Sequence, residues 1–179
     1  MTKAEKLLAF EYTLSRLHDW YKEAYTESSK NDISILKSLK LLFFISAVDA
    51  NINSQNTLLD NTFNNFVAMP YGHVESDVYD GIKQGLLKFT KIDTRNSLID
   101  DAQSLLELDY KTRQNIDISL EKLKTINFDL IKMSSFELVE LSHLWYSWQK
   151  NFQKAKKSHS FSYPISIDEI KGEEKIYQF

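Results

Sequence analysis

The chain has 179 residues, of which 42% are apolar, 26% charged and 13% aromatic, and its formal net charge is −3. This length predicts a single domain over residues 1–179, and the mixed charge argues against a protein that coats nucleic acid. With only 4 Gly and 2 Pro the chain lacks the turn residues of a β-sandwich or barrel, and with 0 Cys it excludes a disulfide framework, a thiolate zinc site and a cysteine nucleophile.

No segment indicates export or membrane insertion. The N-terminus, MTKAEKLLAF, has no small-residue cleavage site of the kind that ends a signal peptide. The longest strongly apolar run, Leu41–Val48, is far shorter than the ~20 residues that a membrane-spanning helix needs. We therefore expect a soluble, cytoplasmic protein with no membrane partner.

The first two segments predict helices. Residues 3–24 place large apolar side chains on one helical stripe, at Leu7, Phe10, Leu14, Leu17 and Tyr21. Asp32 is a candidate N-cap for a second helix that runs to about Asp49. Its segment Leu41–Val48 is apolar all round, which predicts a position at the centre of the core.

Two short strands and a helix are predicted next. Residues 62–69 are typical of a strand, and Met69–Gly72 fits a type I turn with Pro70 in its second position. Ser76 can cap a short helix that Gly85 ends, and residues 86–92 partly alternate like a second strand that pairs with the first.

The C-terminal half is again helical in pattern. Residues 98–108 and 110–126 predict two helices, and Ser134-x-x-Glu137 is a capping box. One long helix is then expected, with its apolar stripe at Leu138, Leu141, Trp145, Trp148 and Phe152. Ser166-x-x-Glu169 predicts a last short helix. The whole pattern predicts a mainly α (α+β) fold with a small two- or three-stranded antiparallel sheet.

The recognised spacings of catalytic and metal sites are absent. There is no phosphate-binding glycine loop, nucleophile elbow or zinc-protease motif. Glu140-x-x-His143 places a carboxylate and an imidazole on one helix face, but a di-iron bundle needs a second such pair. We therefore predict no metal, no cofactor and no catalytic residue, and we interpret His143 as a hydrogen-bonded neighbour of the aromatic stripe.

A basic run near the C-terminus could contact phosphates. It consists of Lys150, Lys154, Lys156 and Lys157. Cations at the end of a solvated helix need no ligand, because they also interact favourably with the helix dipole. We favour that interpretation and do not expect a nucleic-acid partner.

Two segments are more specific than their composition. The apolar helix LKSLKLLFFISAVDA is followed by a polar loop and then by FVAMPYGHVESDVYDGIK. This order resembles the Panacea domain family of bacterial antitoxins and phage-associated proteins, in which a helix of the type KLLYFAQ precedes F-x-A-x-x-Y-G-P-V-x-x-x-V/L-Y. The matching positions are Lys40, Leu41, Leu42, Phe44, Phe66, Ala68, Tyr71, Gly72, Val74 and Tyr79.

A later segment extends the resemblance. ELVELSHLWYSWQKNFQKA is similar to the family's L-x-x-L-S/T-H-x-x-x-x-W-x-x-A, and the whole match spans roughly residues 33–170. The matching positions are Glu137, Leu138, Leu141, Ser142, His143, Trp148 and Ala155. The sequence departs from the family at His73, where the family usually has Pro. Histidine leaves a free N–H and a titratable ring at that position.

The resemblance implies an α-dominated fold with a small antiparallel sheet. It also implies the antitoxin of a two-gene toxin–antitoxin system, which neutralises a cognate toxin protein by binding it and performs no catalysis. The toxins paired with this family are diverse, and they include alarmone-synthetase-like translation inhibitors and membrane-active proteins. Whether neutralisation blocks the toxin or delivers it to a protease stays open, as does homo-oligomer formation.

Two sets of residues follow from the resemblance. The family-motif scaffold consists of Phe66, Gly72, Val74, His143 and Trp148. A toxin-facing surface is predicted at Tyr71, His73 and Tyr79, because a turn that leads into a helix start presents side chains and free N–H groups together. The alternative interpretation is that the residues of this turn hold the fold. Two alternatives stay open: a phage-associated regulatory or nucleic-acid-binding protein that uses Lys150–Lys157, and an enzyme of unrecognised class that uses His143 with Glu140.

Overall fold

A computed structural model describes residues 1–25 and 30–179. Within these residues the chain forms eight α-helices, two 3₁₀ turns and five short strands. The helices are α1 (Lys3–Ala24), α2 (Ile35–Ala47), α3 (Leu58–Asn61), α4 (Ser76–Lys83), α5 (Tyr110–Ile126), α6 (Ser135–His143), α7 (Tyr146–Lys157) and α8 (Ile167–Gly172), and the 3₁₀ turns are η1 (Ser104–Glu107) and η2 (Phe128–Lys132). The strands are β1 (Phe66–Met69), β2 (Gly72–Glu75), β3 (Thr90–Ile92), β4 (Ser97–Ile99) and β5 (Tyr163–Pro164). The predicted mainly α fold with a small antiparallel sheet is confirmed.

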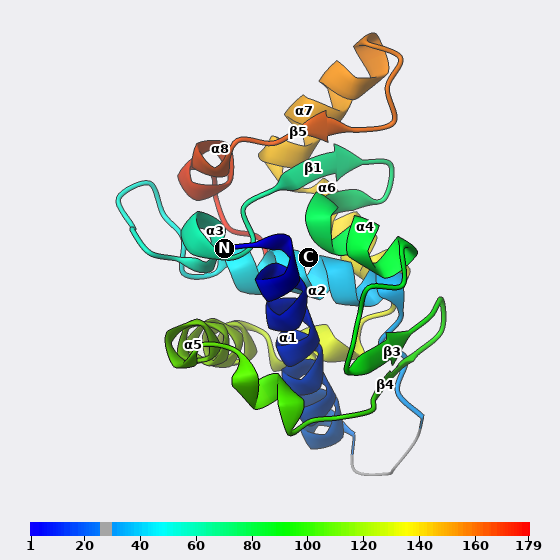
Figure 1. Cartoon of the computed structure of the whole chain (residues 1–179). Helices are drawn as coiled ribbons and strands as arrows, with labels where there is room; N and C mark the ends of the chain where they lie inside the picture. The colour runs from blue at the N-terminus through cyan, green and yellow to red at the C-terminus, as the bar shows by residue number, and fades with distance from the viewer. Residues whose placement is uncertain (26–29) are drawn as a thin grey trace.

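The helix α2 lies at the centre of the molecule. Figure 1 shows it between the sheet with α7 on one side and α5 with the β3–β4 hairpin on the other. Every residue of Leu41–Val48 is buried, as predicted. The predicted cap is wrong: Ser34, not Asp32, is the N-cap and accepts the N–H of Lys37 at 3.2 Å. Asp32 instead pairs with the Lys37 ammonium, at 2.7 Å.

The strands form two separate antiparallel sheets. In the first, the strand order is β2–β1–β5, and Met69 pairs with Gly72 across the two-residue loop Pro70–Tyr71. In the second, β3 pairs with β4. The expected pairing of residues 86–92 with the first strand is therefore wrong, because the chain from β3 turns back at once through Asp93, which accepts the N–H groups of Arg95 and Asn96.

Two predicted helices differ in the structure. Residues 98–108 contain the end of β4 and only one 3₁₀ turn, because the Asp101 carboxylate binds the N–H groups of Gln103 and Ser104 and so favours a local turn. The expected long helix is two helices, α6 and α7, separated at Trp145, whose backbone is extended. This break lets α6 pack on α2 while α7 packs on β1 and β5.

Of the other predicted boundaries, the Ser76 cap is wrong, because Glu75 is the N-cap of α4 and accepts the N–H of Val78 at 2.9 Å, and the strand expected over 62–69 is limited to β1. The remaining ones agree better with the structure. The helix over residues 3–24 is present, and the Ser134–Glu137 capping box opens α6. Gly85, with φ of 66°, follows the end of α4, and α8 begins after Ser166, although the Ser166 side chain makes no capping hydrogen bond. None of the helices in the described part of the chain has the length and apolar composition needed to cross a membrane.

Candidate partner-binding site

His73 fastens the β1–β2 hairpin to the helices beneath it. Its side chain is fully buried, and its ring stacks on that of Phe43 from α2 with 3.7 Å between the centroids. Nδ1 lies 2.8 Å from the Ser142 hydroxyl and Nε2 lies 2.9 Å from the Ser147 hydroxyl. The backbone N–H of His73 also donates to Ser142 Oγ, at 3.1 Å. These contacts join β2 to α2, α6 and α7.

A buried lysine lies beside this histidine. The ammonium of Lys40, on α2, donates to the backbone carbonyl of His73, and no carboxylate of the described residues lies within 4 Å of it. Burial lowers the pKa of Lys40 to about 7. Burial also lowers the pKa of His73 well below its usual range, and the charge of Lys40 and then that of His143 add to the effect. The His73 ring is therefore neutral at physiological pH, with one donor and one acceptor nitrogen for the two serine hydroxyls.

Gly72 is required by the same packing. Its φ is 94°, a conformation that side chains with a Cβ rarely adopt. A Cβ at this position would lie 2.5 Å from Ser142 Oγ and 3.2 Å from Lys40 Nζ. The glycine of the motif is therefore a structural requirement of the hairpin.

Half-buried aromatic rings lie next to the hairpin loop. His143, at the end of α6, stacks on Trp148 at 3.7 Å, and Trp148 stacks on Phe152 at 5.0 Å. The indole N–H of Trp148 donates to the Met69 carbonyl at 2.8 Å, which ties this stack to β1. Burial, followed by the charge of Lys40, lowers the pKa of His143, and its Nε2 has no hydrogen bond in the described residues.

Two exposed side chains lie beside these rings, near the loop between β1 and β2. Tyr71, in the loop, is 59% exposed, and Leu144, which follows His143, is 43% exposed. We define the hairpin-tip surface as these two residues together with His143 and Trp148. It presents apolar and aromatic side chains beside buried polar groups, which is typical of the centre of a protein interface.

The structure places the three predicted toxin-facing residues differently. Tyr71 is exposed, but the expected exposure of His73 is wrong. The reason is that the loop leads into β2 and not into a helix start, so His73 belongs to a strand whose residues are all buried. Tyr79 is half-buried on α4, which packs against α1 and β2, and the Lys83 ammonium lies 5.3 Å from its ring centroid. A toxin contact at Tyr71 or Tyr79 stays a prediction.

The predicted scaffold residues lie in or beside the core. Phe66 is 1% exposed and Val74 is 5% exposed, and both belong to the hairpin strands. His143 and Trp148 are half-buried in the stack described above.

The sequence also pointed to Glu140 with His143, and to the basic run, as candidate ligand groups. Among the described residues no group of three or more His, Asp or Glu side chains could hold a metal ion. Glu140 is exposed, whereas the ring of His143 faces Trp148. In the basic run, Lys150 pairs with Glu169 of α8, and Lys154 donates to Asn151 at 2.9 Å.

The sequence interpretation placed Lys40 and Ser142 among the motif positions but did not predict that they, together with Ser147, contact His73. Lys40 was detectable, since it directly precedes the strongly apolar segment Leu41–Val48, next to which its ammonium could be expected to be buried as well. The serines left no such signal, because a hydroxyl is equally common on exposed helix faces.

Comparisons with known proteins give one family. No curated protein and no solved structure matches the chain significantly. A family model described as "Antitoxin SocA-like, Panacea domain" matches residues 39–149, a shorter span than the 33–170 expected but more than half of the chain. The match begins inside α2, contains the whole β1–β2 hairpin and α6, and ends in α7. The chain therefore belongs to the SocA-like antitoxin family with a Panacea domain.

Proposed function

We propose that this protein is an antitoxin that neutralises a toxin protein by binding it directly, in the cytoplasm and without catalysing a reaction. The observation that supports this proposal is the family match over the central helix, the hairpin and α6. The resemblance of the motifs to Panacea-domain antitoxins points the same way.

The location of the motif residues narrows where a toxin can bind. Gly72, His73 and Ser142 are packed against one another inside the domain. They therefore stabilise the fold and have little surface for a partner to contact. A stable interface of roughly 1,200–2,000 Å² must therefore come from exposed side chains. The hairpin-tip surface supplies Tyr71 and Leu144 for that purpose, and tyrosine is among the residues that contribute most to binding energy.

The test is co-expression with the product of the neighbouring gene. That product should arrest growth when expressed alone, growth should return when this protein is co-expressed, and the two chains should co-purify. A neighbouring product that is harmless alone, or one that stays toxic and unbound, contradicts the proposal.

The absence of catalysis has its own test. Stoichiometric divalent metal that survives dialysis and is lost in His143→Ala would favour an enzyme. A steep fall of nucleic-acid affinity with salt, reduced by replacing Lys156 and Lys157, would instead favour the nucleic-acid-binding alternative.

A further inference from the structure

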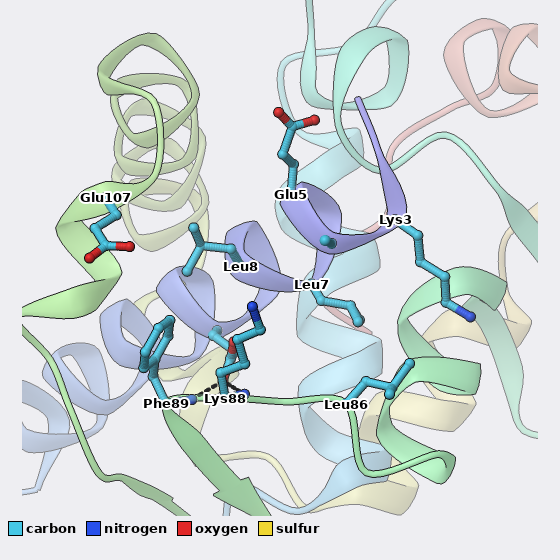
Figure 2. Close-up of a pocket in the computed structure, with 10 residues that line it drawn as sticks. Lys3, Glu5, Leu7, Leu8, Leu86, Lys88, Phe89 and Glu107 are labelled. Carbon is cyan, nitrogen blue, oxygen red and sulfur yellow. Dashed lines mark hydrogen bonds between the residues drawn. The ribbon is translucent and has the colours of Figure 1, made fainter.

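A groove lies beside the N-terminal half of α1, away from the contacts of His73. Its volume is about 450 Å³, and it is bounded by α1, by the connection from α4 to β3, and by η1. Figure 2 shows Leu7 and Leu8 of α1 on the side of that helix that borders the connection with Leu86, Lys88 and Phe89. The walls are mainly apolar and the rim is charged, with Lys3, Glu5, Lys88 and Glu107 all exposed.

A buried carboxylate also lines this groove. Glu11 is only 2% exposed. Its Oε1 accepts the backbone N–H groups of Lys88 at 2.9 Å and Phe89 at 2.7 Å, and the hydroxyl of Thr90 at 3.1 Å. Among the described residues, Oε2 receives no hydrogen bond, and no side-chain cation lies within 4 Å of either oxygen.

This arrangement leaves one oxygen of a buried carboxyl group without a hydrogen bond among the described residues. Buried carboxylates are normally paired with a cation as well as hydrogen-bonded, because moving a charge out of water is costly. Glu11 has the hydrogen bonds on one oxygen and lacks the cation. The groove in front of it is large enough for an alkyl chain and has apolar walls for that chain to contact.

We propose that this groove binds a lysine or arginine side chain of the protein partner, with its cation on Glu11 and its apolar stem against Leu7, Leu8 and Phe89. Basic side chains commonly bury their stems on apolar surface while the charged end finds a polar group. The inference rests on the proposed function, which supplies a protein as the partner.

The rim favours a protein over a free amine as the occupant. Charged residues of both signs surround the apolar centre, which is the arrangement found where two proteins meet. Leu86 is 44% exposed at the edge of the groove, where an apolar neighbour of the bound basic residue would cover it.

The chemistry of the groove is tested first without a partner, with hexylammonium as the stand-in for a lysine side chain. Methyl and aromatic NMR signals of Leu7, Leu8, Leu86 and Phe89 should shift on titration, and hexanol should bind about tenfold more weakly or worse. Glu11→Gln keeps the oxygen that accepts the backbone N–H groups and should remove this preference for the cation. Equal binding of hexylammonium and hexanol to the wild-type protein, or no shift at the groove, overturns the proposal.

A second variant tests the groove in case Glu11→Gln does not fold. Leu86→Ala removes apolar wall at the edge without touching Glu11 and should weaken hexylammonium binding about threefold or more. Leu106→Ala is the matched control, because Leu106 is 46% exposed and does not line the groove. If both leucine variants bind hexylammonium alike, the groove is not the binding site and the proposal fails.

The last experiment measures binding of the protein partner itself. The purified neighbouring gene product should protect the groove signals, and Glu11→Gln should weaken its binding about tenfold or more. If the toxin is neutralised equally well by wild-type protein and Glu11→Gln, the groove proposal is wrong while the antitoxin function stands. If no toxin is neutralised at all, the function is wrong, and protein as the occupant of the groove is wrong with it.

Discussion

Two buried lysines lie at the two ends of the same short strand, and their surroundings differ. Near Glu75, at the C-terminal end of β2, the ammonium of Lys6 pairs with Glu75 at 2.7 Å and with Asp77 at 2.6 Å. Near Gly72 and His73, at the N-terminal end, the ammonium of Lys40 has the His73 carbonyl as its one hydrogen-bond partner among the described residues. A buried ammonium is therefore paired with carboxylates at one end of β2 and with a backbone carbonyl at the other.

The pKa values follow from this difference. Burial acts to lower the pKa of Lys6, but the hydrogen bonds and charges of Asp77 and Glu75 outweigh it, and the pKa is raised. Among the described residues no carboxylate opposes the effect of burial on Lys40, whose pKa falls to about 7. One end of the strand is held by charge pairing and the other by neutral hydrogen bonds and ring stacking. The second end contains Gly72, the motif position at which a Cβ would lie 2.5 Å from Ser142 Oγ.

The largest expected effect is at the paired end. Glu75→Ala removes the carboxylate that binds Lys6, caps α4 through the N–H of Val78, and accepts the N–H of Asn65. We expect a loss of about 3–5 kcal/mol in the free energy of unfolding, measured by urea denaturation, because Lys6 keeps a buried charge with one partner fewer.

Asp77→Ala is the control for the paired end. The Asp77 side chain is 34% exposed, so the loss should be about 1 kcal/mol or less. Equal losses in the two variants would show that the ion pair with Glu75 is no more important than an exposed one, and the contrast between the two ends of β2 would fail.

The next effect is at the neutral end. His73→Ala leaves a cavity against Phe43 and removes the ring partners of the Ser142 and Ser147 hydroxyls. The cost should be about 2–4 kcal/mol in urea denaturation, as for other large-to-small core changes. A variant with unchanged stability would show that the histidine ring is not packed as described.

A smaller effect is expected in the pH dependence of stability. The pKa of Lys40 is about 7 in the folded chain and 10.5 in the reference state, so the unfolded chain binds more protons between these values. The penalty for burying Lys40 is therefore full below pH 7 and declines as the pH rises. Lys40→Met should reduce the increase in stability between pH 7 and 9 by up to about 1.4 kcal/mol per pH unit.

The window from pH 7 to 9 limits interference from other groups. Lys37 and Lys175 also have lowered pKa values, mainly because of burial, so the increase should shrink and not vanish. Tyr12, whose pKa burial and Asp117 raise to about 12, titrates above this range. An identical pH profile in wild-type protein and Lys40→Met would contradict a neutral Lys40.

The sequence predicted helices better than it predicted how the chain passes between them. Periodicity and capping boxes located α1, α2 and the start of α6, since those signals are local. The break at Trp145 was not predictable from the stripe, because it depends on where α2, β1 and β5 lie. The same limit explains His73: its neighbours in the fold, Ser142 and Ser147, are 69 and 74 residues away in the chain.

The smallest effect on stability is expected at Tyr71, and it separates scaffold from surface. Tyr71 is 59% exposed and adjoins Gly72, so Tyr71→Ala should change the free energy of unfolding by about 0.5 kcal/mol or less. If the hairpin-tip surface binds the toxin, the same variant should weaken co-purification and growth rescue, because an exposed aromatic anchor is lost.

Tyr110→Ala is the matched control, since Tyr110 is 69% exposed on α5 and lies outside that surface. Full rescue by both variants, with both folded, would move the toxin contact away from the hairpin. Loss of rescue in both would show that exposed tyrosines matter without regard to place. Loss of rescue in Tyr71→Ala but not in Tyr110→Ala would show that the toxin contacts the loop between β1 and β2. The contacts of His73 at the neutral end of β2 would then position a binding surface.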